Sequence, residues 1–203
     1  MRFQDLTEEN ARLQNEINQL KAQTAQLQEA SLENQRLRNL LSLPQGTQFK
    51  SISALVVAKD SSNLTRTIVI SQGSLNGVKP GMSVIFGAGL VGRVIETFPG
   101  SSKVALLTDF NSKIPAKIQR TREEGVVLGT LKPGQNICQI KYIHDAQIGD
   151  KVISSGLGGR CPKGLLIGEI IAVTDDESGL YKIAQIRSEV DFSTLEEAMI
   201  ILE

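Results

Sequence analysis

Leucines recur every seven residues along the first part of the chain, at Leu6, Leu13, Leu20 and Leu27. On a slightly underwound helix, a repeat of seven places these side chains in one stripe, at position d of a coiled-coil heptad. The a positions between them are mostly polar, and the remaining faces carry Gln, Glu, Asn and Lys. The pattern predicts a long helix whose narrow apolar stripe packs against a second helix.

The predicted seam is weak but directional. Asn10 at an a position sets the register of two parallel helices at some cost in stability, and Glu16 faces Lys21 of the partner helix. The residues predicted to dimerise are Leu6, Asn10, Leu13, Ile17, Leu20, Leu27, Leu37 and Leu41. Such a helix of about 36 residues, at about 1.5 Å per residue, forms a rod of about 54 Å. An amphipathic helix folded onto its own domain is the alternative interpretation.

Beyond Pro44 and Gly46, which end the helix, short runs rich in Val and Ile alternate with turn residues. This spacing predicts a mainly β fold, with an N-terminal coiled-coil helix followed by two tandem small β-barrel-like domains. Strands are expected near residues 51–58, 65–71, 83–86, 89–98, 103–108, 114–118, 125–131, 137–143, 151–154, 166–174, 181–187 and 198–202. The expected boundaries are 1–43 for the helix, 44–50 for a linker, 51–120 for the first β-domain and 121–203 for the second.

The two series of strands match one another in order, which indicates an internal repeat. The matching pairs are 81–85 with 149–153, 90–95 with 166–171, 103–107 with 182–186, and 109–112 with 191–194. Each copy has a glycine inside the second of these segments, Gly92 and Gly168, where glycine permits a bulge or a sharp bend. Because such bends close small barrels, we expect each copy to close separately around its own core.

Composition excludes several classes of function. The chain has 22 basic and 22 acidic residues, no basic run, and no Trp, so it lacks the electrostatic footprint of a nucleic-acid-binding protein. No run approaches 18 apolar residues, so no segment of the sequence is expected to span a bilayer.

The sequence lacks the parts of a hydrolytic site. His144 is the single histidine, and Asp145 beside it would point to the opposite face of a strand. Ser154 and Ser155 do not stand in a G-x-S-x-G arrangement. We therefore expect no catalytic residue, and we interpret His144 as a turn or edge residue with its polar tip in water.

Cofactor and metal sites are not expected either. The glycine-rich segment 156–164 lacks the Walker pattern and is followed by a β pattern, so it is interpreted as a tight turn. One His and two distant cysteines give no metal-ligand spacing. Cys138 and Cys161 are expected to be buried thiols, and a disulfide between them remains open.

Several stretches, in their order along the chain, carry a family resemblance. They are the coiled coil with its Pro-Gly break, residues 77–84, 89–94 and 108–109, and the late stretches 148–159, 162–164 and 167–168. Together they resemble the MreC family of bacterial rod-shape-determining proteins over nearly the whole chain. The resemblance implies an extracytoplasmic coiled coil with two β-domains, on the periplasmic face of the inner membrane. It also implies a membrane anchor upstream, which this chain does not contain.

The resemblance further implies a non-catalytic scaffold of the cell-wall elongation machinery. It would form a homodimer, associate into filaments, and hold a class B penicillin-binding transpeptidase, RodA, MreD and, across the membrane, MreB. A periplasmic adaptor of an export system, similar to membrane-fusion proteins, is the alternative. In those proteins a helical hairpin interrupts the β sequence, whereas here one helix precedes it.

The turn at residues 86–90 is the candidate partner-binding surface. Phe86 and Leu90 are apolar and stand beside glycines, and a transient partner requires apolar anchors that remain accessible. The alternative, that both side chains close the end of the barrel, is equally open.

Overall fold

In the described residues of Phe49–Glu203, which we call the β part, twelve strands form one hydrogen-bonded sheet that closes on itself twice. The structure is a computed structural model, and it describes residues 2–40, 49–60, 65–130, 136–159, 161–176 and 179–202. The chain divides into two compact units, Met1–Gln48 and Phe49–Glu203. The predicted fold class, mainly β with an N-terminal helix, is confirmed.

The described residues of the first unit form the helix α1, which spans Arg2–Leu40. Its 39 residues correspond to a length of about 58 Å. The predicted helix end at residue 43 and most of the predicted linker lie outside the described residues. Where the side chains of α1 are described, every one is exposed, including all four apolar members of the predicted seam in that region.

Six strands form the first closed ring, in the order β4-β3-β12-β1-β2-β5, with β5 pairing back to β4. Their bounds are Lys50–Lys59 for β1, Thr67–Ile70 for β2, Ser83–Phe86 for β3, Gly89–Thr97 for β4, Ser102–Leu106 for β5 and Glu197–Leu202 for β12. A short 3-10 helix, η1, spans Ser74–Asn76 between β2 and β3.

The other six strands form the second closed ring, in the order β10-β9-β6-β7-β8-β11, with β11 pairing back to β10. Their bounds are Lys113–Ile118 for β6, Glu124–Gly129 for β7, Ile137–Ile143 for β8, Lys151–Ser154 for β9, Leu166–Asp175 for β10 and Lys182–Ser188 for β11. The strand orders of the two rings correspond position by position, as expected from the repeat.

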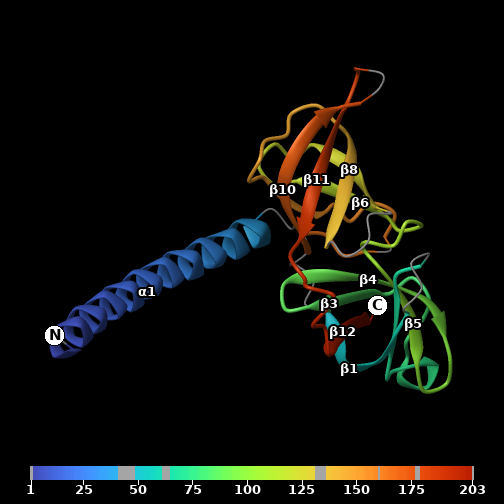
Figure 1. Cartoon of the computed structure of the whole chain (residues 1–203), viewed down its shortest axis with the longest axis horizontal. Helices are drawn as coiled ribbons and strands as arrows, with labels where there is room; N and C mark the ends of the chain where they lie inside the picture. Colours follow the sequence, from blue (N-terminus) through green and yellow to red (C-terminus); the bar gives the residue numbers. More distant parts are fainter. Residues whose placement is uncertain are drawn as a thin grey trace. The chain divides into compact units, whose positions relative to one another are not determined.

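The two sequence copies exchange their last strands. β6 follows the first copy but pairs with β7 and β9 of the second ring. β12 follows the second copy but pairs with β1 and β3 of the first ring, and in Figure 1 it lies, dark red, beside the cyan β1 and the green β3. The prediction that each copy closes separately is therefore wrong, and the boundary between residues 120 and 121 separates the copies but not the rings.

The strand patterns alone do not distinguish this exchange from separate closure. Both terminal strands, β6 and β12, have similar patterns of buried and exposed residues. A strand pattern records which residues face inward but not which distant strand is the neighbour. The buried side chains of both rings accordingly form one continuous hydrophobic cluster instead of two separate cores.

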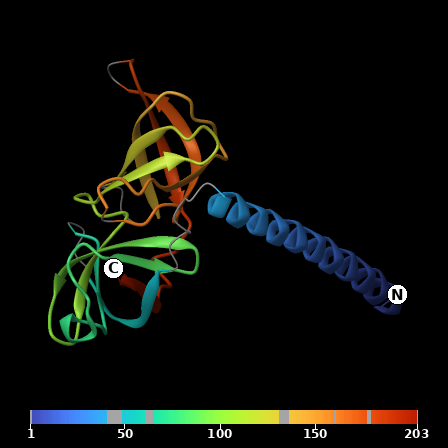
Figure 2. The same ribbon diagram turned by 180° about the vertical axis from the view of Figure 1, so that it is seen from behind.

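The predicted bends lie at the two strand glycines. In the first ring the register between β3 and β4 shifts next to Gly92, and in the second ring the register between β9 and β10 shifts next to Gly168. Beside these bends the rings join: Leu166 on β10 forms a parallel bridge to Gly89 on β4, and its backbone N–H donates to the oxygen of Ala88 at 3.2 Å. Figure 2 shows the two groups of strands from behind.

A buried carboxylate fixes the turn that precedes β9. Asp150 is almost fully buried and accepts two hydrogen bonds from the guanidinium of Arg120, at 2.8 and 2.9 Å, and one from the backbone N–H of Gln147 at 2.9 Å. The Arg120 hydrogen bonds lower the pKa of Asp150 below its ordinary value of 3.8, against the opposing effect of burial. The charged form of Asp150 therefore stabilises the fold.

The expected result is a pH-dependent stability difference between the wild-type chain and Asp150→Asn. A depressed folded-state pKa contributes stability that is complete above the unfolded-state pKa and disappears as the pH falls through the folded-state pKa. At about pH 7 we expect the variant to melt several degrees below wild type, and we expect the two melting temperatures to converge below about pH 4. Thermal unfolding of both proteins across this pH range measures the difference in melting temperature. A difference that does not depend on pH would contradict the stabilising role of the charged Asp150.

Candidate functional site

The outer face of β1, β12 and β3 carries an exposed apolar groove. Residues paired directly across antiparallel strands share a face of the sheet. Ser53 on β1 lies opposite Met199 on β12, and Met199 lies opposite Ile85 on β3, so these three side chains form one row across the strands. Leu55 lies two residues further along β1, on the same face. This row is the floor of the groove.

The groove has a volume of about 440 Å³. It is lined by Ser53, Ala54, Leu55, Ser71, Gln72, Ile85, Phe86, Gly87, Glu197, Ala198 and Met199. Two large apolar side chains in it remain open to solvent: Leu55 is 56% exposed and Phe86 is 50% exposed. We call this set of residues the apolar groove.

Polar residues fix the edge of the apolar groove. The hydroxyl of Ser71 accepts a hydrogen bond from the backbone N–H of Leu55 at 2.9 Å, and the amide of Gln72 donates to the backbone oxygen of Ser53 at 3.0 Å. An apolar centre with a polar rim is the composition typical of protein–protein interfaces. The geometry therefore suits the docking of apolar side chains from another protein.

The structure separates the two predicted partner-binding residues. Phe86 is accessible and belongs to the apolar groove, whereas Leu90 is 0% exposed and belongs to the core. The interpretation of Leu90 as an accessible anchor is wrong, because the turn that carries it also joins the two rings at Ala88 and Gly89. For Leu90, the alternative that it closes the barrel is the one the structure supports.

The predicted dimerisation residues lie along α1. Leu13, Ile17, Leu20 and Leu27 are between 44% and 71% exposed, and Asn10 is exposed as well. Leu41 lies outside the described residues, and for Leu6 and Leu37 only the backbone is described. The apolar stripe is thus open in a single chain, and its pairing with a second chain stays a prediction.

The serines and the histidine considered for catalysis have structural partners. The hydroxyl of Ser154, which is fully buried, donates to the backbone oxygen of Pro162 at 2.5 Å and accepts from the backbone N–H of Leu165 at 2.9 Å. His144 lies in a bend after β8, mostly exposed, with Nδ1 2.6 Å from Oε1 of Glu123. Ser154 thus holds a turn of the chain.

The thiols are buried, as predicted. Cys138 and Cys161 are both free, so the open alternative of a disulfide is not found in this structure. Burial raises the pKa of Cys138 to about 12, which keeps this thiol protonated. Among the described residues no group of three or more His, Cys, Asp or Glu side chains is arranged to hold a metal ion.

Comparison with known proteins decides the family. The family model described as "Rod shape-determining protein MreC, barrel core" matches residues 56–202, which include nearly all of both rings. The chain belongs to the MreC family. The MreC cell shape-determining protein of Listeria monocytogenes is 29% identical over 199 residues, covering 95% of this chain. Across the curated MreC relatives that it matches, the chain spans between 48% and 71% of their length.

Solved MreC structures share the fold. One from Listeria monocytogenes is 29% identical with a TM-score of 0.78, covering 93% of this chain and 91% of that chain. A major periplasmic domain of the cell shape-determining filament MreC has a TM-score of 0.68 at 23% identity, covering 78% and 98% of the two chains. The MreC chain solved in complex with the penicillin-binding protein PBP2 from Helicobacter pylori has a TM-score of 0.61 at 15% identity, covering 77% and 99%.

The MreC barrel core carries groove residues that the sequence pattern did not identify. Leu55, Ile85 and Met199 lie far apart in the chain and meet because β12 pairs between β1 and β3. The exposed side of a strand can be predicted from its alternation, so an apolar residue such as Leu55 at an outward position was a usable signal. Its neighbours could not be predicted, since they depend on the strand exchange.

Proposed function

We propose that this chain is a non-catalytic scaffold that dimerises through α1 and presents its barrels to peptidoglycan synthases, thereby maintaining cell shape. The observation that carries the proposal is the apolar groove, where Leu55 and Phe86 stay exposed beside a polar rim. Membership in the cell-shape MreC family supports the biological role. The solved complex of a relative with PBP2 supports a penicillin-binding transpeptidase as the partner.

The remaining partners and the location follow from the family. RodA, MreD and, across the membrane, MreB complete the proposed assembly, and the β part would act on the extracytoplasmic side of the inner membrane. The periplasmic domain solved for a relative supports that location. No helix within the described residues combines the length and apolar character that a membrane span requires.

The test replaces the accessible anchors of the apolar groove with charge. We expect Leu55→Asp and Phe86→Asp each to weaken binding to a purified transpeptidase ectodomain by about 2 kcal/mol, or about 30-fold, because each removes a central apolar anchor. Binding is measured by titration calorimetry alongside thermal unfolding. Both variants should melt like wild type, because the two side chains are exposed already.

Two controls accompany this experiment. Ile148→Asp makes the same kind of change at an exposed apolar residue of the second ring, outside the apolar groove, and should leave binding intact. Leu90→Asp buries a charge in the core and should lower the melting temperature strongly. Wild-type affinity in both groove variants would remove this face from the partner surface.

A further inference from the structure

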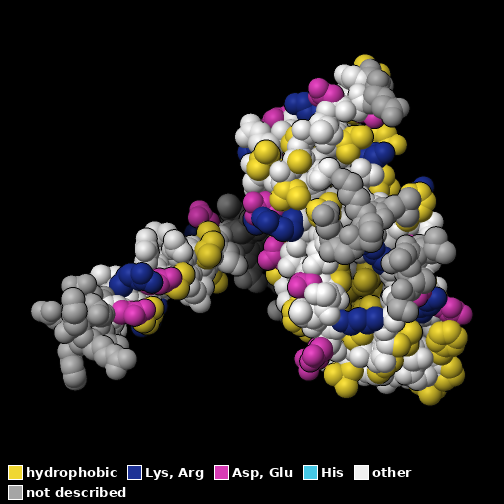
Figure 3. Space-filling model, in the orientation of Figure 1, with side chains coloured by type: hydrophobic (Ala, Val, Ile, Leu, Met, Phe, Trp, Pro, Cys, Tyr) yellow, Lys and Arg dark blue, Asp and Glu magenta, His cyan; other side chains and the backbone are white. Residues whose placement is uncertain are grey.

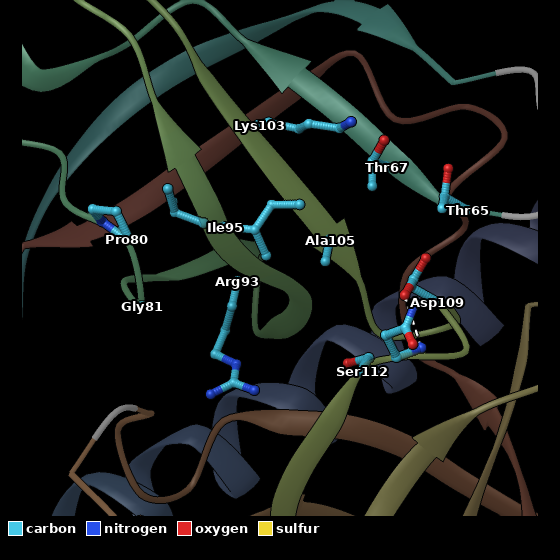
Figure 4. Close-up of a pocket in the computed structure, with 12 residues that line it drawn as sticks. Thr65, Thr67, Pro80, Gly81, Arg93, Ile95, Lys103, Ala105, Asp109 and Ser112 are labelled. Atoms are coloured by element: carbon cyan, nitrogen blue, oxygen red, sulfur yellow. Dashed lines mark hydrogen bonds between the residues drawn. The ribbon is translucent and has the colours of Figure 1, made fainter.

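A second hollow, distinct from the apolar groove, lies on the outer face of β2, β5 and β4. Its volume is about 630 Å³, within the range usual for ligand sites. Ala105 at its centre lies opposite Thr67 on β2 and Arg93 on β4, and the short alanine side chain leaves space between longer neighbours. Figure 4 shows Pro80 and Gly81 on one side of Ala105, and Asp109 with Ser112 on the other side. We call this site the cationic groove.

Two cations border the cationic groove. Lys103 and Arg93 lie on opposite sides of the floor formed by Ile95 and Ala105 (Figure 4). Within the described part of the chain, neither cation forms an ion pair with a carboxylate. One terminal nitrogen of Arg93 donates to the backbone oxygen of Lys113 at 2.9 Å, which anchors the guanidinium and leaves its other N–H groups available.

The carboxylate in the wall is already bound by the backbone. Asp109 is buried, and its Oδ2 accepts from the N–H of Arg66 at 2.7 Å while its Oδ1 accepts from the N–H of Asn111 at 2.9 Å. Each of its two oxygens therefore already accepts one backbone hydrogen bond. The side chains that line the hollow carry two positive charges and this single, internally bonded negative charge.

The cationic groove thus presents two cations separated by an apolar floor. Ile95 is half exposed on that floor, and the polar side chains of Asn111 and Ser112 border it. Carboxylates match the two cations, and a guanidinium binds a carboxylate through paired hydrogen bonds. An apolar side chain between two carboxylates matches Ile95 and Ala105. A purely polar anionic polymer would leave this apolar floor without a partner.

We propose that the cationic groove binds an extended acidic segment of a partner protein, with carboxylate side chains at Arg93 and Lys103 and an apolar side chain on the floor between them. This site lies on other strands than the apolar groove and does not depend on it. The scaffold would then hold one partner by apolar docking and another by charge. Like-charged segments would be rejected by the same two cations.

The experiment measures binding of a fluorescent peptide of alternating Glu and Leu to the intact chain, with an alternating Lys and Leu peptide for comparison. We expect the acidic peptide to bind, the basic one not to bind, and the affinity to fall as salt is raised. Lys103→Glu should weaken binding at least about tenfold. The side chain of Lys103 forms no hydrogen bond to another described residue, and Glu96 lies opposite it on β4, so we expect this variant to stay folded and to melt slightly below wild type. Arg93→Lys, which keeps the charge but loses the paired hydrogen bonds, should give an intermediate affinity.

The matched control is Lys141→Glu with Lys182→Glu, which reverses charge on the second ring and should leave binding unchanged. Phe86→Asp should also bind the acidic peptide normally, which keeps this test separate from that of the apolar groove. Three results would overturn the proposal: no binding of the acidic peptide by wild type, unchanged affinity in Lys103→Glu, or polyphosphate binding as tightly as the peptide. The last would assign the groove to anionic polymers instead.

Discussion

The double variant Leu20→Glu with Leu27→Glu is expected to be a monomer at micromolar concentration, where we expect the wild-type chain to be a dimer. Burying one leucine on a partner helix contributes about 1.5 to 3 kcal/mol. Four such side chains are lost from the dimer, which amounts to about 6 to 12 kcal/mol, whereas a dimer with micromolar affinity is held by about 8 kcal/mol. The loss is large enough to dissociate the dimer, and analytical ultracentrifugation measures it.

The control places the same charges away from the seam. With the leucine stripe at position d, Asn18 occupies a b position and Gln26 a c position, both away from the seam. Asn18→Glu with Gln26→Glu should therefore remain dimeric. Thermal unfolding of the β part should be the same in both double variants, because α1 and the β part are separate compact units. A dimer that persists in Leu20→Glu with Leu27→Glu would place dimerisation in the barrels.

Gly92→Ala and Gly168→Ala are each expected to destabilise the β part by about 3 kcal/mol. A Cβ added at Gly92 would lie 1.9 Å from the backbone oxygen of Ala105, and one added at Gly168 would lie 2.0 Å from the backbone oxygen of Arg187. Neither oxygen can move without breaking strand pairing. For a unit of this size the melting temperature should fall by about 6 to 12 °C.

The matched control is Gly100→Ala, where an added Cβ meets no atom within 4 Å and the melting temperature should change little. We also expect each of the two strand-glycine variants to unfold in a single calorimetric transition with a lowered midpoint temperature, because each ring contains a strand from the other copy. Two separate transitions, with only one of them shifted, would show that the rings unfold independently despite the exchange.

Two features of the candidate site show how far sequence reasoning extends. The accessibility of Phe86 and the burial of Leu90 could not be separated from the sequence, since both are apolar residues beside glycines in one turn. The joint between the rings, formed at Ala88 and Gly89, decides between them. The cationic groove likewise depends on the small Ala105, which lies between its hairpin neighbour β4 and β2, a strand from further back in the chain.

The sequence by itself determined the features that depend on local periodicity. The sevenfold leucine repeat predicted the long helix, and the alternation of apolar and polar residues predicted strands close to their observed positions. The matching segments, with Gly92 and Gly168 at equivalent points, predicted the common architecture of the rings and the site of their bends. Each of these signals lies within a few neighbouring residues, where backbone geometry fixes which side chains share a face.

Only the tertiary structure decided how the strands are distributed between the rings. β6 and β12 have similar burial patterns, and their exchange is set by long-range pairing, of β12 with β1 from the other end of the β part and of β6 with β9 of the second copy. That exchange places Met199 between Ser53 and Ile85 and so creates the apolar groove. A surface built from distant strands has no signature in any single stretch of sequence, because contacts between them are settled only when the whole sheet closes.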